Sequence, residues 1–185
     1  MAASRDIPTP LGPMSAVATD AGLAALEFPG VRTDRAFADL GIDRDNCARS
    51  HPILDAAEAW LAAYFADAHQ SEDRHRQTAP TLSLPPLDLR GSVFELAVWR
   101  ALLDIPRSQT RTYADIACAL GKPGAARAVG LANGRNRMAI IVPCHRVIGA
   151  DGSLTGYGGG LDRKRKLLHH EGALDTVDHL PLFTI

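Results

Sequence analysis

Residues 140–148 read Ile-Ile-Val-Pro-Cys-His-Arg-Val-Ile, and this stretch decides how the second half of the chain is organised. Its β-branched apolar residues predict a buried, extended backbone, and Pro143 fixes φ directly before Cys144. The Cys144 thiol is therefore expected to be held rigidly at the edge of a core. An ordinary thiol pKa of about 8.5 leaves roughly a few per cent of thiolate at neutral pH, so a reactive Cys144 needs a base or a positive dipole.

His145 follows directly and is the nearest candidate base. Neighbours on a strand point to opposite faces, so a buried structural cysteine beside a surface histidine is the commoner explanation of a Cys-His dipeptide taken alone. The next residues favour a reactive site. Six glycines surround Tyr157 in residues 149–160, a composition that brings backbone N–H groups close to a flat ligand. A flexible hairpin is the alternative, because residues 151–152 are an Asp-Gly turn signal.

A further helix is predicted over residues 161–171, and it contains four consecutive basic residues and ends before Gly172. Three motifs then carry a family resemblance: Pro-Cys-His-Arg-Val at 143–147, Thr-Gly-Tyr-x-Gly-Gly-Leu at 155–161 and Lys-x-x-Leu-Leu-x-x-Glu-Gly at 164–172. Together they resemble the O6-alkylguanine-DNA alkyltransferases, also called methylated-DNA–protein-cysteine methyltransferases. The resemblance is strong over residues 94–172 and weaker before them.

The composition of the 185 residues, 46% of them hydrophobic, suits one large or two small domains with an ordinary core. Residues 1–10 contain no apolar segment of the kind found in signal peptides, so neither secretion nor membrane insertion is expected. Cys47, Cys118 and Cys144 are too few and too scattered for a disulfide framework or a cysteine-rich zinc site. Cys47 and His51 have a spacing that suits a metal, but no second pair accompanies them. We expect no metal or other cofactor, and a reducing cytoplasm as the setting.

The formal net charge of −1 hides an uneven distribution. Residues 1–89 hold seven Lys or Arg against thirteen Asp or Glu, whereas residues 90–172 hold thirteen against six. A basic second half indicates a surface that binds a polyanion, although a solvated charged surface gives the same count.

The predicted fold class is α+β, with a small N-terminal domain over residues 1–80 that combines an antiparallel sheet and a helix. Residues 14–19 and 23–28 are predicted as strands around a tight turn, and residues 52–68 as an amphipathic helix. Proline-rich residues near 70–90 are predicted as the linker. No catalytic group of residues is recognisable in this half.

The second domain, residues 90–173, is predicted to be mainly helical. Ser-Val-Phe-Glu at 92–95 is a capping box that begins one helix, and Pro106 ends it. Thr-Tyr-Ala-Asp at 112–115 begins a second helix, Gly-Lys-Pro-Gly at 121–124 breaks it, and a third follows over 125–132. This order predicts a helix-turn-helix, although ordinary helical hairpins have the same spacing. Residues 174–185 are predicted to be a tail.

The last of these helices has small side chains, with Ala126, Ala128 and Gly130 around Arg127. They offer little to read base edges in a major groove but let the helix backbone approach a narrow groove, so we expect minor-groove binding. Tight packing against other helices is the alternative. By resemblance, Arg127 enters the base stack in place of an extruded nucleotide, and Tyr113 crowds the phosphate to rotate that nucleotide outward.

The resemblance also implies the catalytic residues. Cys144 attacks the alkyl carbon as thiolate, His145 takes the thiol proton through a water, and Glu171 orients the imidazole. Tyr113 donates a hydrogen bond towards N3 of the leaving guanine. Asn136 matches the asparagine that links the DNA-binding helix to the active-site strand.

The implied substrate pocket has a wall made by Tyr157 and the glycine-rich loop, with Lys164 also assigned to it. Backbone carbonyls near Cys144 and Val147 accept from the guanine amino group, and the Gly158 N–H donates to O6. The base has to be flipped out of the duplex to enter this pocket.

The resemblance therefore implies an enzyme that irreversibly transfers the alkyl group of O6-alkylguanine, and of O4-alkylthymine, from double-stranded DNA to its own cysteine, once per molecule. A non-catalytic sensor of alkylated DNA that recruits other repair factors is the alternative, but such proteins carry another residue at the cysteine position. A helix-turn-helix regulator or a cysteine hydrolase fits the motifs less well. We expect a cytoplasmic, nucleoid-associated monomer that clusters on DNA.

The C-terminal pentapeptide is similar to the Gln-Leu-x-Leu-Phe motif with which bacterial DNA-maintenance proteins bind the replicative sliding clamp, so clamp docking is a further hypothesis. An apolar tail that packs on its own domain is the alternative. The residues of the pentapeptide are His179, Leu180, Pro181, Leu182 and Phe183.

Overall fold

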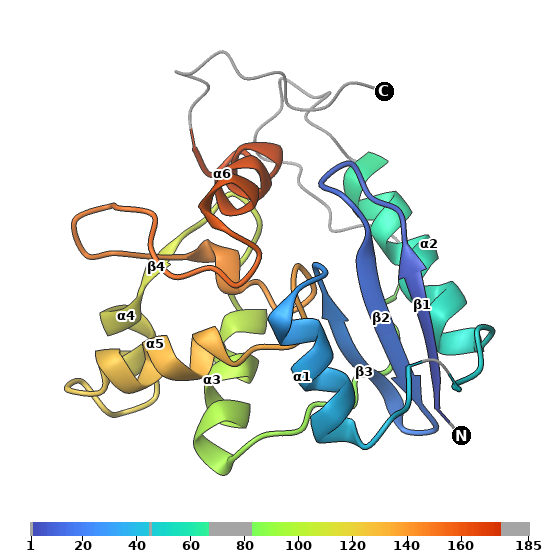
Figure 1. Ribbon diagram of the computed structural model, residues 1–185. Coiled ribbons are helices and arrows are strands. Elements are labelled where there is room, and N and C mark those ends of the chain that lie inside the picture. Colours follow the sequence, from blue (N-terminus) through green and yellow to red (C-terminus); the bar gives the residue numbers. More distant parts are fainter. Residues whose placement is uncertain (1, 45, 67–82, 175–185) are drawn as a thin grey trace. The chain divides into compact units, whose positions relative to one another are not determined.

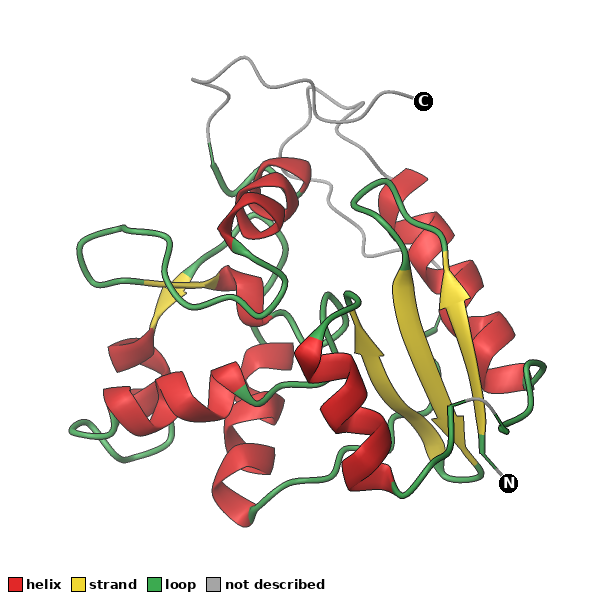
Figure 2. Ribbon diagram, viewed as in Figure 1, coloured by secondary structure: helices red, strands yellow, loops and turns green. Residues whose placement is uncertain are grey.

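The computed structural model describes residues 2–44, 46–66 and 83–174 (Figure 1). These residues form two compact units, the first ending at Arg90 and the second beginning at Gly91. The first unit combines a sheet with helices and the second is mainly helical, as the sequence predicts for an α+β fold (Figure 2). Within the described ranges, no helix has the length and apolar character needed to cross a membrane.

The first unit is built on a three-stranded antiparallel sheet in the order β1-β2-β3. β2 (Met14–Thr19) and β3 (Gly22–Glu27) confirm the predicted hairpin. β1 (Ala3–Ile7) was not predicted, because its Arg5 and Asp6 interrupt the apolar pattern. Both side chains have partners outside the strand: Arg5 pairs with Asp55 at 2.9 Å, and Asp6 accepts a 2.6 Å hydrogen bond from Ser15.

Both edges of the sheet pair with further segments of the chain. At one edge, the Ser4 N–H of β1 donates to the Ala48 carbonyl at 2.8 Å. On the other side the Leu23 N–H donates to the Pro86 carbonyl at 2.7 Å, and the Asp88 N–H returns a 2.8 Å bond to Leu23. The predicted linker region therefore contains a short segment that extends the sheet of the first unit.

Two helices cover the sheet, α1 (Val31–Leu40) and α2 (Pro52–Ala66) (Figure 2). α2 was predicted and buries Leu54, Ala57, Trp60, Leu61 and Tyr64. α1 was missed because half of its residues are polar, and only Thr33, Ala36 and Phe37 are buried among its described side chains. Ala36 and Phe37 pack with Val17 and Ala25 of the sheet into one apolar cluster.

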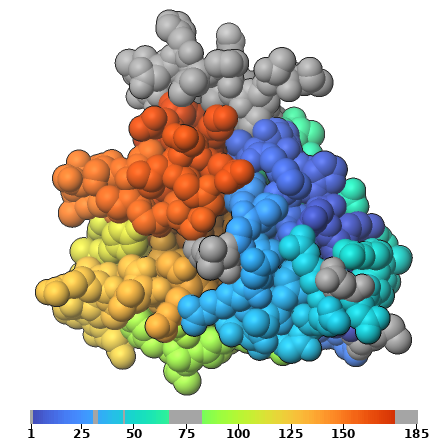
Figure 3. Space-filling view, viewed as in Figure 1, coloured from blue at the N-terminus to red at the C-terminus, as the bar shows by residue number. Residues whose placement is uncertain are grey.

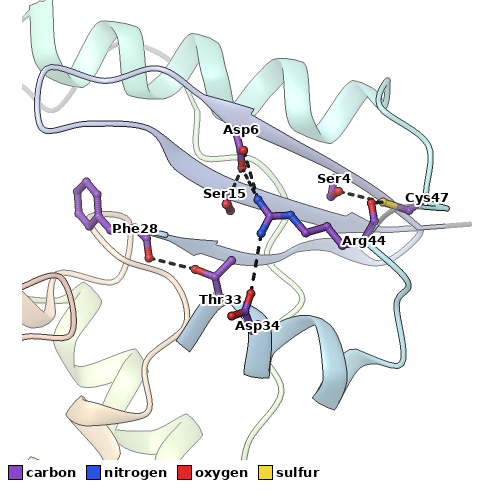
Figure 4. Close-up of polar contacts among 8 residues, drawn as sticks. All are labelled: Ser4, Asp6, Ser15, Phe28, Thr33, Asp34, Arg44 and Cys47. Carbon is purple, nitrogen blue, oxygen red and sulfur yellow. Dashed lines mark hydrogen bonds and ion pairs between the residues drawn. The ribbon is translucent and has the colours of Figure 1, made fainter. Parts of the chain in front are cut away.

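A polar cluster fastens the loop after α1 to the sheet (Figure 4). The Arg44 guanidinium lies 3.3 Å from the Asp6 carboxylate and 3.9 Å from that of Asp34. Cys47 Sγ lies 2.9 Å from the Ser4 hydroxyl, whereas the His51 ring accepts a 3.2 Å bond from the Ile53 N–H at the start of α2. Cys47 and His51 thus have separate structural partners. The described residues contain no group of three or more His, Cys, Asp or Glu that could hold a metal ion.

In the second unit, both predicted capping boxes are present. Ser92 and Glu95 cap α3 (Val93–Leu103), and Thr112 and Asp115 cap α4 (Tyr113–Ala119). α5 (Ala126–Gly134) follows the turn and packs on both helices. The buried Trp99 indole of α3 donates to the Ala132 carbonyl at 2.9 Å, which anchors α5. The predicted helix-turn-helix is thereby confirmed in outline.

The remaining elements complete the unit around the Pro-Cys-His-Arg-Val motif. β4 (Arg111–Thr112) pairs in parallel with β5 (Val147–Ile148). The 3₁₀ helix η1 (Cys144–Arg146) directly precedes β5. The last helix, α6 (Leu161–His170), packs on η1. Gly172 has φ 70°, as expected for the residue after a helix end. The pentapeptide at residues 179–183 lies outside the described residues.

Candidate active site

The backbone before Cys144 is a compact turn, so the predicted extended strand over residues 140–142 is wrong. Asn136 explains the difference, because its buried amide satisfies backbone groups that a neighbouring strand would otherwise bind. Its Nδ2 donates to the Val142 carbonyl at 2.9 Å, and its Oδ1 accepts from the Met138 N–H at 2.9 Å. Only β5, after the motif, is extended.

Ile140 lies within this turn with φ 70°, in the left-handed region that β-branched residues rarely enter. Its side chain is 1% exposed, so burial in the core offsets the backbone cost. The apolar run at 140–142 is buried as predicted, but in a bent backbone rather than a strand.

Cys144 is the first residue of η1 and is 6% exposed. Its N–H donates to the Val142 carbonyl at 2.7 Å, and its own carbonyl accepts from the Val147 N–H that closes η1. Asn133 of α5 supplies a second donor to that carbonyl, Nδ2 at 3.4 Å. Both the N–H and the carbonyl of Cys144 are therefore hydrogen-bonded, which fixes the backbone that carries the thiol.

His145 is fully buried, and its Nε2 lies 3.0 Å from Oε1 of Glu171. Arg146 holds the same carboxylate through Nε and Nη2, each at 2.8 Å, and its Nη1 donates to the Ile105 carbonyl. His145 is therefore not the surface histidine that the structural alternative for the Cys-His dipeptide requires. His145, Glu171 and Arg146 form one buried polar network.

The protonation states of this network follow from its charges. Burial raises the pKa of Glu171, but the nearby His145 and the hydrogen bonds from Arg146 outweigh burial and hold this pKa well below its ordinary range. Burial lowers the pKa of His145 below 6.5, although Glu171 opposes this shift. Glu171 is therefore an acceptor, and Nε2 of a neutral His145 has to be the donor.

This assignment leaves Nδ1 of His145 unprotonated. Nδ1 is buried and has no hydrogen-bond partner among the residues that the structure describes. A buried basic nitrogen in this position can accept a proton, directly or through a water. The network therefore holds a basic nitrogen on the residue that follows Cys144 in the chain.

Lys164 of α6 is fully buried, and its ammonium donates to the carbonyls of Val147 and Thr155. Burial lowers its pKa from 10.5 to about 8, while Cys144 acts in the opposite direction. The attraction between the two side chains is mutual, so a charged Lys164 stabilises a Cys144 thiolate. Through these two hydrogen bonds, Lys164 also connects the glycine-rich loop with β5.

Tyr113 of α4 contacts the glycine-rich loop, and Tyr157 belongs to this loop. The Tyr113 hydroxyl donates to the Thr155 carbonyl at 3.3 Å, and a Cβ on Gly156 would lie 3.1 Å from this oxygen. With φ 56° as well, position 156 favours glycine. The Tyr157 ring meets His145 edge-on, with ring centroids 6.4 Å apart. Gly158 is exposed at the surface of the same loop.

The outer face of α5 is separate from the buried network. Arg127 and Ala128 are exposed, whereas Ala126 and Gly130 are half-buried, and Gly130 faces the Tyr113 ring. Figure 3 shows the helix-turn-helix region, in yellow and gold, at the surface of the second unit. The small side chains thus serve both interpretations: Gly130 allows close packing, while Ala128 leaves the helix backbone accessible beside Arg127.

The structure brings together most of the sequence-predicted pocket residues around η1 and the glycine-rich loop. Two further residues were missed. Arg146 belongs to the quoted motif, but nothing in the sequence indicates that it binds Glu171. Asn133 appears as a small polar residue in an Ala- and Gly-rich helix, and only its burial and its contact with the Cys144 carbonyl single it out.

Comparisons with known proteins identify the family of the chain. The family model described as "6-O-methylguanine DNA methyltransferase, DNA binding domain" matches residues 93–173. A methylated-DNA–protein-cysteine methyltransferase from Methanosarcina barkeri is 43% identical over 165 residues, which cover 89% of this chain and 94% of that protein. The chain belongs to the family of methylated-DNA–protein-cysteine methyltransferases.

Similarity to individual members extends to solved structures. The enzyme of this name from Mycobacterium tuberculosis is 64% identical over 97 residues, but the match covers 52% of this chain and only 58% of that relative. The crystal structure of Mycobacterium tuberculosis OGT in complex with DNA superposes with a TM-score of 0.73 and 43% identity, and covers 92% of both chains.

Proposed function

We propose that this protein repairs DNA by transferring the alkyl group of O6-alkylguanine irreversibly to Cys144. The observation that carries the proposal is the unpartnered Nδ1 of the fully buried His145, whose ring is held by Glu171 and which follows the nearly buried Cys144 in the chain. A structural cysteine needs neither a neighbouring base nor a buried ammonium such as Lys164. Membership of the methyltransferase family supports the same activity.

The transfer begins when Nδ1 of His145 takes the Cys144 proton, with one water as the relay. The imidazolium that forms is stabilised by Glu171, which remains ionised. Lys164 stabilises the thiolate until it reacts. Proton transfer creates a cation on His145 and an anion on Cys144, and the opposite charges of Glu171 and Lys164 offset its cost.

The thiolate then attacks the alkyl carbon and displaces the guanine oxygen. A sulfur–carbon bond forms while the carbon–O6 bond breaks, and the electron pair of the broken bond stays on the guanine. Tyr113 moves its hydroxyl from the Thr155 carbonyl towards N3 to stabilise this negative charge. The guanine anion takes up a proton, and His145 releases the proton that it accepted from Cys144, so proton balance is restored. The products are guanine and an S-alkylcysteine that no group in the site hydrolyses, so each molecule acts once.

The pocket that receives the flipped base is formed by the glycine-rich loop and β5. Tyr157 provides an aromatic wall against His145, and the N–H of the exposed Gly158 donates to O6 in this proposal. The carbonyls of Cys144 and Val147 already accept from Asn133 and Lys164, so the guanine amino group shares them as an additional donor. We expect O4-alkylthymine, which lacks that amino group, to be a weaker substrate.

The DNA is bound through the outer face of α5, with Ala126, Ala128 and Gly130 allowing close approach in the minor groove. Arg127, exposed at this face, fills the space that the flipped nucleotide leaves. The non-catalytic sensor is less consistent with the site, since a sensor requires neither the thiol nor the base. Monomeric action, clustering along DNA and a nucleoid location are parts of the same proposal.

The experiment that tests this function is a single-turnover assay with excess duplex containing O6-methylguanine. We expect one methyl group per protein molecule and no further turnover, and we expect none for Cys144→Ala. Repeated turnover would instead identify a hydrolase. Tight binding of the duplex by the wild-type protein without methyl transfer would identify a sensor.

A further inference from the structure

Asn133 connects the DNA-binding helix to the backbone of the nucleophile. It lies near the end of α5 and is 3% exposed. Its Nδ2 donates to the Cys144 carbonyl at 3.4 Å, and the Val147 N–H donates to the same oxygen. These two donors hold the Cys144 carbonyl, and so they fix the orientation of the peptide plane between Cys144 and His145 relative to α5.

The other half of the Asn133 amide is not satisfied. Its Oδ1 is buried, and no described residue donates to it. A buried amide that meets only part of its hydrogen-bonding capacity stabilises a fold less than an apolar side chain of the same shape. The Cys144 carbonyl would keep the Val147 N–H if Asn133 were apolar. Fold stability alone therefore gives no reason for an asparagine here.

The position of Asn133 suggests the reason. On the same helix, Val129 and Ala132 face the core and Arg127 faces outward. Asn136, by contrast, acts on the turn before the nucleophile through Met138 and Val142. Asn133 is the residue of α5 whose side chain bonds directly to the Cys144 backbone.

We propose that Asn133 is a positioning residue, which fixes the Cys144–His145 peptide relative to α5 so that the thiol points at the base delivered by that helix. This inference rests on the proposed transfer to Cys144. Displacement at carbon requires the sulfur to approach in line with the breaking carbon–oxygen bond, so a small rotation of the peptide slows transfer strongly. A small diffusing alkylating reagent has no such requirement.

The test compares directed and undirected alkylation of Cys144 in the full chain. Asn133→Leu keeps the side-chain shape and removes the donor. We expect transfer from the O6-methylguanine duplex to slow at least about tenfold. We also expect alkylation by iodoacetamide to keep its rate and pH profile within about twofold and the melting temperature to stay the same or rise.

Two further variants separate the donor from packing. Asn133→Asp has the same shape but no donor when ionised, so its transfer should be at least as slow as that of Asn133→Leu. Val129→Ala removes buried volume from the same helix, since Val129 is fully buried. It should lower the melting temperature but leave transfer by the folded protein within about twofold of wild type.

Wild-type transfer rates in Asn133→Leu or Asn133→Asp would overturn the inference. A lower melting temperature together with faster iodoacetamide alkylation in Asn133→Leu would also overturn it, because that pair of results describes a merely structural residue. If the wild-type protein itself transfers no methyl group, the proposed function fails instead. The transfer rate of the wild-type protein therefore distinguishes a failure of the inference about Asn133 from a failure of the proposed function.

Discussion

Arg146 binds the carboxylate of Glu171 through two parallel hydrogen bonds of 2.8 Å, at a point where both side chains are buried. One of the two oxygens also accepts from His145. The negative charge of Glu171 is therefore balanced by a permanent cation before His145 gains a proton. Burial is the main cause of the lowered pKa of His145, and the positive charge of Arg146 lowers this pKa further, so the imidazole is neutral before it accepts a proton.

Removing Arg146 should destabilise the protein strongly. Arg146→Met leaves the Glu171 carboxylate buried without its bidentate partner, and breaking a buried ion pair from one side costs about 3–5 kcal/mol. Urea unfolding at neutral pH measures this loss. Arg146→Lys retains the charge without the planar fork and should lose less stability. Equal stability of Arg146→Met and wild type would contradict the assigned role.

The pH dependence follows from the lowered pKa values of His145 and Glu171. Each group has a lower pKa in the folded protein than in the unfolded chain, so the unfolded chain takes up protons first as the pH falls. Their stabilising contribution is complete above pH 6.5 for His145 and above pH 4.5 for Glu171, and it is lost in acid. Urea unfolding at a series of pH values should show a plateau between pH 6.5 and about 8, where the lowered pKa of Lys164 begins to contribute, and a decline below pH 6.5.

The transfer rate should follow the same ionisation of His145. Burial lowers its pKa below 6.5, so the base remains neutral and active to a lower pH than an exposed histidine. Single-turnover rates measured against pH should give an acid midpoint below 6.5. A midpoint above this value would mean that the folded protein stabilises the His145 imidazolium, which contradicts the lowered pKa assigned to this residue.

Lys164 should contribute through its charge. Its pKa of about 8 predicts that transfer weakens above this pH, as the ammonium that favours the thiolate loses its proton. Lys164→Met should transfer slowly at neutral pH and lack this alkaline decline. Circular dichroism of the variant checks that the loop contacts at Val147 and Thr155 are not needed for folding. Wild-type rates in Lys164→Met would exclude an electrostatic role.

Arg127 should matter for the duplex but not for the chemistry. Arg127→Ala should slow transfer from duplex O6-methylguanine much more than transfer from the free base O6-benzylguanine, because only the duplex requires a flipped nucleotide to be replaced. Arg127→Lys is the matched control, which keeps the charge and part of the length. Equal slowing of both substrates would place Arg127 in the chemical step instead.

The elements with strong local signals could be predicted from the sequence. The two capping boxes at Ser92 and Thr112 determine where α3 and α4 begin, and the structure confirms both. α1 and β1 could not be predicted, because their stability comes from tertiary contacts. Arg5 and Asp6 make β1 appear too polar, and their partners lie elsewhere in the first unit.

The same distinction applies to the site. Cys144, His145 and Glu171 are marked by motifs, whereas the bent backbone at residues 140–142 depends on the Asn136 side chain. The apolar run predicts burial correctly, but burial alone does not distinguish a strand from a turn whose N–H and C=O groups are satisfied by an amide. The bond of Asn133 to the Cys144 carbonyl is likewise a tertiary contact between two segments that no local pattern relates.

The central claim is that Cys144 receives the alkyl group from DNA. Peptide mapping by mass spectrometry after saturating exposure to O6-methylguanine duplex tests it most directly. We predict a methyl group on the peptide that contains Cys144, in an amount equal to the guanine restored in the DNA. An unmodified Cys144 in a protein whose circular dichroism and melting temperature are those of the folded state would contradict the account.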